Sequence, residues 1–166
     1  MAKKLSIIIP AYKVDAYIEK CIRTLENQDL PKEEYEIIVT NDGSPDRCQE
    51  IVEELQKEFS NLILINQENQ GVSMARNNAI AKAQGEYILP IDPDDYVVSN
   101  TLKAAYENAK SRNLDVLYLA FEVFDKDENA IWETDYKSIN ETIFDGVQGY
   151  FEPRSVETKE IGRAHV

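Results

Sequence analysis

The stretch LSIIIP, residues 5–10, decides the fold because it is short, rich in β-branched residues and almost uniformly apolar. A run of this kind is typical of a strand that is covered on both faces, as in a parallel sheet. Four later runs share this character: YEIIVTN at 35–41, NLILIN at 61–66, EYILPI at 86–91 and LDVLYLAFEVF at 114–124. The sequence therefore predicts five strands, and DKDENAIWETDYKSI at 125–139 suggests a turn near 127–129 and a further strand.

The segments between these runs carry apolar residues at helical spacing. Four helices are expected there, near residues 17–25, 51–59, 72–83 and 102–109. Asp15 is expected to cap the first helix, and Ser44 and Pro45 to begin the second. Gly85 is expected to end the third. Strict alternation of strands and helices predicts one α/β domain, a mainly parallel sheet with helices on both faces.

Composition and charge exclude several classes of protein. The net charge of −13 argues against a nucleic-acid partner, because phosphate backbones are bound by basic surfaces. No apolar stretch approaches the roughly 20 residues of a membrane span, and the run that ends at Pro10 is too short for a signal peptide. Cys21 and Cys48 both fall in helix-like segments, so a disulfide framework is not expected. These features favour a reduced, cytoplasmic compartment.

Polar side chains follow the predicted strands at the edge where ligands of α/β sheets bind. The DPDD segment at 92–95 offers hard oxygen ligands suited to Mg²⁺ or Mn²⁺, which bind through one or two carboxylates and substrate phosphates. The alternative is a turn that caps the next helix. In NDGSPD at 41–46 the glycine, serine and proline are typical of a turn, whereas Asp42 is placed to accept an N–H from a nucleobase. Arg76 is a candidate partner for an anionic ligand, against the alternative of a solvated arginine.

Several blocks together resemble family 2 glycosyltransferases, which have the GT-A fold. The blocks are SIIIPAYKVDAYIEKCIRTLENQ, YEIIVTNDGSPD and NQGVSMARNNAIAKAQGEYILPIDPDDYV, in the family's order and spacing over residues 4–124. The resemblance implies a nucleotide pocket lined by Pro10, Ala11 and Tyr12, with Tyr12 near the uracil or ribose. It also implies that Asp42 contacts the base.

The same resemblance implies the residues around the diphosphate. Arg76 would approach the nucleotide, and Asp92 would lie near the ribose and donor sugar. Asp94 would be the direct ligand of Mn²⁺ or Mg²⁺. The family usually has an acidic pair before Gly43, and here its first member is Asn41, which keeps an acceptor but loses the charge.

The resemblance divides the chain into three parts. Residues 1–124 correspond to the nucleotide-sugar-binding core, and 125–160 to the start of an incomplete acceptor half. The last six residues, IGRAHV at 161–166, match one reading frame of a widely used sequencing-adapter oligonucleotide, so a non-native tail is expected there. In the family the general base lies downstream of the D-x-D, where Glu152 and Glu157 are expected to be solvated surface charges. No catalytic base is therefore assigned.

The resemblance implies an inverting, metal-assisted transfer of a sugar from a nucleotide diphosphate, with UDP-sugar as the donor class, to a glycan, lipid-linked or other hydroxyl acceptor. Membrane association would come through parts not present. The alternatives are a non-catalytic nucleotide-sugar-binding module and a sugar nucleotidyltransferase, although PAYKVD at 10–15 lacks that class's glycine-rich loop. A receiver domain would need an acidic pair where Pro10 and Ala11 stand. A Ser-His-Asp hydrolase lacks a suitable histidine, since His165 alone is present.

Overall fold

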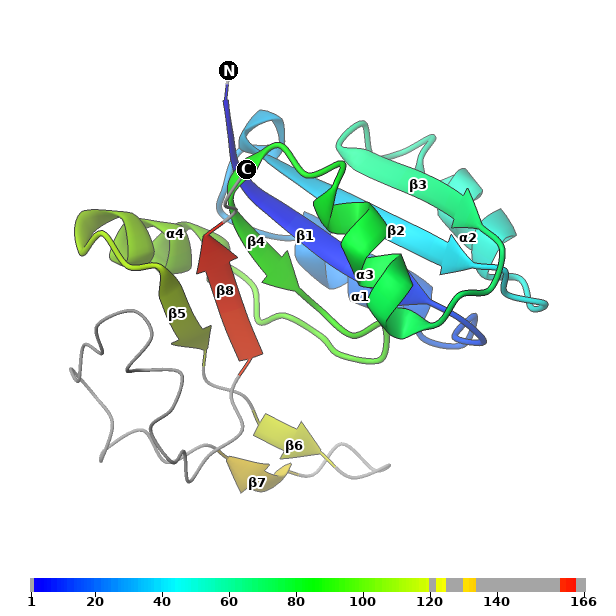
Figure 1. The fold of residues 1–166 in the computed structure, drawn as a ribbon. Helices are drawn as coiled ribbons and strands as arrows, with labels where there is room; N and C mark the ends of the chain where they lie inside the picture. Colours follow the sequence, from blue (N-terminus) through cyan, green and yellow to red (C-terminus); the bar gives the residue numbers. More distant parts are fainter. Residues whose placement is uncertain (1, 120–121, 125–129, 134–158, 164–166) are drawn as a thin grey trace.

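The computed structural model describes residues 2–119, 122–124, 130–133 and 159–163. The chain forms an α/β sheet domain, and a small two-stranded sheet precedes the last strand of the main sheet in the chain (Figure 1). The elements are β1 Lys3–Ala11, α1 Ile18–Glu26, the 3₁₀ turn η1 Lys32–Glu34, β2 Tyr35–Asp42, α2 Cys48–Leu55, β3 Leu62–Gln67, α3 Val72–Ile80, β4 Gly85–Pro90, α4 Leu102–Ser111, β5 Val116–Leu119, β6 Glu122–Phe124, β7 Ala130–Glu133 and β8 Lys159–Arg163.

The main sheet has the strand order β3-β2-β1-β4-β8-β5. The strands β3, β2, β1 and β4 are all parallel, so the predicted parallel α/β arrangement of the GT-A type is confirmed. β8 pairs antiparallel with both β4 and β5 and lies between them (Figure 1). Because the central strands are covered on both sides, β2 is buried along its whole length.

Helices cover both faces of the sheet, as predicted. In Figure 1, α3 crosses the front of the sheet while α1, α2 and α4 lie behind it. The larger core joins inward side chains of β1 and β2 to Ile22 of α1, Val52 of α2 and Leu102 of α4. A smaller core on the other face packs Ala79 of α3 against Ile8, Ile38 and Ile88. The alternation of side chains along each strand sends neighbouring isoleucines to opposite cores.

The predicted strand at 114–124 is wrong as a single element. Residues 116–119 form β5 in the main sheet, whereas residues 122–124 form β6, which pairs antiparallel with β7 in a separate two-stranded sheet. The sequence runs through both strands with the same apolar character, so periodicity alone carries no signal of the change of partner.

Several predicted helix boundaries are also wrong. α2 begins at Cys48 rather than at Ser44 and Pro45, because the N–H of Cys48 bonds instead to a carboxylate oxygen of Asp46. The turn before α1 closes through the carbonyl of Val14, and the Asp15 side chain makes no cap.

The expected end of α3 at Gly85 is wrong as well. The helix ends at Ile80 and Gly85 begins β4. A Cβ at Gly85 would lie 2.3 Å from the backbone nitrogen of Ser6, so glycine is needed there for close approach of two strands.

The predictions for the C-terminal part remain open. Glu152, Glu157 and His165 lie outside the described residues, as does most of the segment 125–160. Residues 161–163 belong to β8, and the non-native origin of 161–166 stays a prediction.

Candidate functional site

The parallel register brings the carboxyl ends of four strands to one edge of the sheet. Ala11 at the end of β1 pairs with Asn41 of β2, and Asn41 pairs with Asn66 of β3. The segments that follow these strands therefore begin side by side, as the sequence predicts. Their polar side chains form two acidic clusters, one after β2 and one after β4.

Asp42, the last residue of β2, has a carboxylate that is already surrounded by donors. It is 2% exposed and accepts hydrogen bonds from the Gln67 side chain at 2.7 Å and from the backbone N–H groups of Gln70 and Gly71, each at 2.8 Å. Burial raises the pKa of Asp42, but the hydrogen bonds from Gln70, Gln67 and Gly71 outweigh it and hold the pKa below its usual value. The carboxylate thus fixes the loop that leads into α3.

The neighbouring Asn41 uses its amide within the protein. Its oxygen accepts the N–H of Ser44 at 3.0 Å, and its NH₂ donates to the side chain of Asn66 at 2.9 Å. Gly43, which lies between Asp42 and Ser44, has φ +63°, and a Cβ there would lie 2.9 Å from the backbone nitrogen of Asn69. The turn after β2 is therefore packed tightly against the turn after β3.

Asp46 is a residue of this edge that sequence reasoning did not single out. Its carboxylate accepts bonds from the Ser44 hydroxyl at 2.6 Å, from the N–H of Asp15 at 3.0 Å and from the N–H of Cys48 at 3.1 Å. Burial raises its pKa, and the bonds from Ser44, Asp15 and Cys48 together lower the pKa of Asp46 to about 2. The bond to Cys48 could be predicted from the sequence, because an Asp just before a helix often bonds to its first N–H groups. The bond to Asp15 could not, because it joins two separate loops.

Arg76 of α3 and Asp92 after β4 form an ion pair. The Nη2 atom of Arg76 lies 2.7 Å from Oδ1 of Asp92, and their side chains are 38% and 48% exposed. The Nε atom of Arg76 is buried and has no partner within the described residues. The structure thus brings together two residues that the sequence places on the same edge, with their charged ends open to solvent.

Asp94 differs from Asp42, Asp46 and Asp92 at this edge. It is exposed, and its carboxylate has no hydrogen bond or ion pair within the described part of the chain. The turn that carries it is closed by the N–H of Asp95, which donates to the carbonyl of Asp92 at 3.0 Å. A carboxylate held on such a turn without protein donors is free to bind a cation.

The described residues do not form a metal site from protein ligands alone. Among the described residues, no three His, Cys, Asp or Glu side chains gather closely enough to hold an ion. This agrees with the chemistry of Mg²⁺ and Mn²⁺, which bind through one or two carboxylates while phosphates and waters fill the other positions. Asp94 fits the part of such a single carboxylate ligand.

The three residues that the resemblance assigns to the nucleotide pocket are placed differently from one another: Pro10 and Ala11 end β1, and Tyr12 follows it. Pro10 and Ala11 are buried, and Ala11 packs into the larger core. Tyr12 is 43% exposed, and the Nζ atom of Lys13 lies 5.2 Å from the centre of its ring. Of the three, Tyr12 offers a surface on which a flat ligand can stack.

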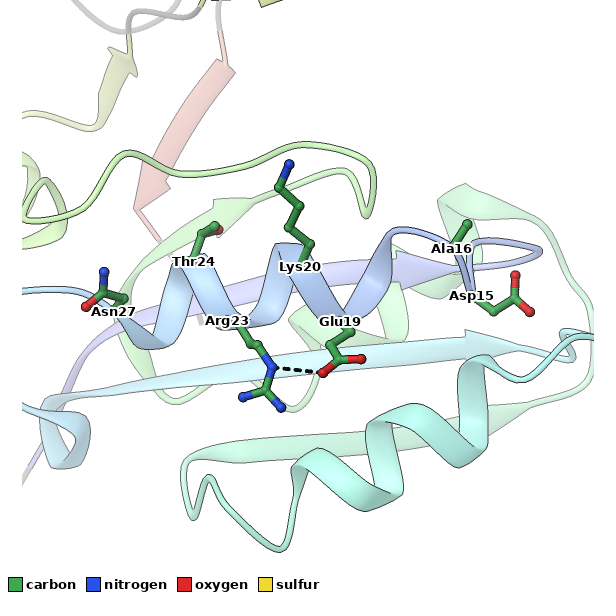
Figure 2. Close-up of a pocket in the computed structure, with 7 residues that line it drawn as sticks. All are labelled: Asp15, Ala16, Glu19, Lys20, Arg23, Thr24 and Asn27. Carbon is green, nitrogen blue, oxygen red and sulfur yellow. Dashed lines mark hydrogen bonds and ion pairs between the residues drawn. The ribbon is translucent and has the colours of Figure 1, made fainter. Parts of the chain in front are cut away.

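A hollow of about 460 Å³ runs along α1 and contains none of the predicted nucleotide-binding residues. Figure 2 shows the side chains that line it, with Glu19 and Arg23 paired at 2.9 Å. They are Asp15, Ala16, Glu19, Lys20, Arg23, Thr24 and Asn27. Arg23 also pairs with Glu58 of the neighbouring segment, so the charges of Arg23, Glu19 and Glu58 are paired within the protein.

In the part of the chain that the structure describes, no helix is long and apolar enough to span a membrane.

Comparison with known proteins identifies similar chains. A family model for Glycosyl transferase family 2 matches residues 6–160. The uncharacterized glycosyltransferase EpsJ of Bacillus subtilis is 42% identical over 121 residues, which are 73% of this chain and 35% of that protein. The poly(ribitol-phosphate) β-glucosyltransferase of Bacillus spizizenii is 39% identical over 115 residues, 68% of this chain and 18% of that protein. The chain thus spans about a third or less of the length of these relatives.

Two solved structures share the fold. The crystal structure of Staphylococcus aureus TarS 1–349 in complex with UDP-GlcNAc has a TM-score of 0.66 and 37% identity, covering 69% of this chain and 33% of that one. The mannosyltransferase PcManGT of Pyrobaculum calidifontis, in complex with GDP-Man and Mn²⁺, has a TM-score of 0.53 and 26% identity, covering 57% of this chain and 28% of that one.

Proposed function

The chain belongs to glycosyl transferase family 2, and from this premise we propose that its carboxyl edge binds the UDP-sugar donor of a glycosyltransferase. The observation that carries the proposal is Asp94, an exposed carboxylate without a partner in the described residues, beside the ion pair of Arg76 and Asp92. An anionic diphosphate needs a cation and positive side chains nearby, and this edge supplies a place for both. TarS with UDP-GlcNAc supports the donor class.

We propose the following roles for the residues of the edge. Tyr12 stacks on the uracil or ribose, above the buried Pro10 and Ala11, which shape the floor of the pocket. Asp42 faces the base, and its three protein hydrogen bonds keep the adjacent loop in place while the nucleotide is bound.

The remaining roles concern the diphosphate and the sugar. Arg76 contacts the diphosphate, and Asp92 orients that arginine and approaches the ribose and donor sugar. Asp94 holds Mn²⁺ or Mg²⁺, which supplies positive charge to the leaving diphosphate when it is bound. The bound Mn²⁺ in the mannosyltransferase supports this choice of cation.

The proposed reaction is inverting. An acceptor hydroxyl attacks the anomeric carbon as the bond from that carbon to the diphosphate oxygen breaks, and a general base takes the hydroxyl proton. We place this base and most of the acceptor site beyond residue 124. The acceptor is proposed to be a hydroxyl of a glycan or another polymer, and the cytoplasmic location remains a prediction.

Calorimetric titration of UDP with and without Mn²⁺ tests the proposal. We expect wild-type protein to bind UDP only with the metal, and Asp94→Asn to weaken that binding at least about tenfold, since one charge-assisted ligand is lost. Glu107→Gln removes the same charge from an exposed position of α4 and is expected to bind like wild type. A folded wild-type chain that binds no UDP, or equal binding by Asp94→Asn, would overturn the proposal.

A non-catalytic nucleotide-sugar-binding module is the second candidate, because no catalytic base is assigned among the described residues. Measuring UDP release from UDP-GlcNAc with Mn²⁺ separates the two. Metal-dependent UDP binding without turnover identifies a binding module, whereas turnover that is lost in Asp94→Asn identifies a transferase.

A further inference from the structure

We propose that Asp46 is a positioning residue, which fixes the backbone turn that presents Tyr12 at the nucleotide pocket. The inference rests on the proposed function, because Tyr12 has a role only if a nucleotide binds beside it. It goes beyond the proposed function because it states that a carboxylate on a different loop positions this turn.

The turn after β1 has an unusual backbone. Lys13 has φ +56°, in the left-handed region that residues other than glycine adopt uncommonly. Tyr12 directly precedes it, 43% exposed, with the Lys13 ammonium 5.2 Å from its ring centre. Because such a backbone conformation is unfavourable by itself, contacts from elsewhere must maintain it.

Those contacts come from the turn after β2. The N–H of Lys13 donates to the Ser44 hydroxyl oxygen at 2.7 Å, across a separation of 31 residues. The Ser44 hydroxyl in turn donates to Oδ1 of Asp46 at 2.6 Å. A hydroxyl has one proton to donate, so Asp46 directs that proton and leaves an oxygen lone pair facing Lys13.

The second oxygen of Asp46 holds the other side of the same turn. The N–H of Asp15 donates to Oδ2 at 3.0 Å. One carboxylate thus secures the backbone at Lys13 through a serine and at Asp15 directly, so Tyr12 enters a turn that is held at two points. A residue whose only role was to start α2 would need neither of these bonds.

Asp46 is itself anchored to the fold. Oδ1 also accepts the N–H of Cys48, the first residue of α2, at 3.1 Å. The turn that carries Tyr12 is therefore tied to the beginning of a helix that packs into the larger core. The carboxylate is ionised in the neutral range, so each of these bonds is charge-assisted, and the same bonds lower the pKa of Asp46 to about 2.

Amide hydrogen exchange tests this assignment without any nucleotide. Ser44→Ala is expected to speed exchange at the Lys13 amide about tenfold, the usual effect of losing one hydrogen bond. Asp46→Asn is expected to speed exchange at both Lys13 and Asp15. Asp15→Asn is the matched control, because it removes the same charge from the turn while its own carboxylate makes no hydrogen bond or ion pair in the described residues. Exchange at Lys13 within twofold of wild type in Ser44→Ala would overturn the proposal.

A double-mutant cycle then connects the turn to the nucleotide. In the presence of Mn²⁺, we expect Ser44→Ala to weaken UDP binding about fivefold in the wild-type background and not at all when Tyr12→Ala is already present. Equal losses in both backgrounds would show that the turn does not act through Tyr12. If wild-type protein binds no UDP, the proposed function fails, while the exchange experiment still decides whether Asp46 and Ser44 hold the turn.

Discussion

Two acidic clusters lie at the carboxyl edge of the sheet, and Asp42 and Asp46 of the first differ from Asp94 of the second in what already contacts their carboxylates. Asp42 accepts three hydrogen bonds from the end of β3 and the loop after it, and Asp46 accepts bonds from its own loop and from the turn after β1. After β4, Asp94 has no donor within the described residues. The comparison teaches that carboxylates of one edge differ in how much of their hydrogen-bonding capacity the fold already uses, and Asp94 keeps the most for a ligand.

The largest effect on stability is expected at Asp42. Replacing it with Ala leaves the N–H groups of Gln70 and Gly71 without their partner, so the free energy of unfolding should fall by about 2–3 kcal/mol. Asp94→Ala should change the same quantity by less than about 0.5 kcal/mol, because nothing in the fold depends on it. Urea unfolding at pH 7 measures both, and similar losses in the two variants would contradict the division into two clusters.

A smaller effect is expected from the acid dependence of stability. The pKa of Asp46 is about 2 in the folded protein, against 3.8 for an unperturbed Asp. Its stabilising contribution is therefore present above pH 4 and is lost as the pH falls from 4 toward 2. Asp46→Asn should flatten this part of the stability curve by about 1 kcal/mol, after a reduction for solvent screening.

The comparison with the second cluster sharpens this test. Asp94→Asn is expected to keep the wild-type acid dependence, because the Asp94 carboxylate makes no hydrogen bond or ion pair in the described residues that the substitution could remove. Urea midpoints measured between pH 5 and pH 2 distinguish the variants. If the stability of Asp46→Asn depends on pH as that of the wild type does, the bonds to Asp46 contribute little to stability.

A smaller effect on stability than that at Asp42 is expected at Arg76. Its pair with Asp92 is partly exposed on both sides, and exposed pairs typically contribute less than about 1 kcal/mol. Arg76→Ala should therefore lower the free energy of unfolding only slightly but weaken UDP binding with Mn²⁺ about tenfold, since a charge-assisted contact is lost. Arg76→Lys keeps the charge and should recover part of the affinity. A large loss of stability with unchanged affinity would assign Arg76 to the fold.

The sequence predicts the strands better than it predicts their surroundings. Strands buried on both faces need continuous apolar runs, so β1 to β4 are visible in the sequence within a few residues of their bounds. The caps of α1 and α2 differ from the expected ones, because the N–H groups at their starts bond to Val14 and Asp46. A cap depends on which donor a loop brings near, and spacing does not reveal that.

For the candidate site too, the sequence predicts the location but not the contacts between loops. The edge that carries Tyr12, Asp42 and Asp94 follows from the parallel topology, which the alternating pattern indicates. The division of the acidic residues does not follow, because it depends on contacts between loops about 30 residues apart, such as that of Asp15 with Asp46. The antiparallel insertion of β8 between β4 and β5 was likewise invisible, since it joins segments far apart in the chain.

The position of β3 at the end of the sheet has a consequence for handling the protein. Within the described residues its outer backbone groups have no neighbouring strand, and its sequence LILIN is uncharged, with Ile63 37% exposed. Such an edge is a template for pairing between molecules. At neutral pH the net charge of −13 keeps molecules apart, but this repulsion vanishes near the isoelectric point of about 4.5. The protein is therefore most prone to associate near pH 4.5, which lies within the pH range of the urea measurements proposed for Asp46. Those measurements should be made at low protein concentration.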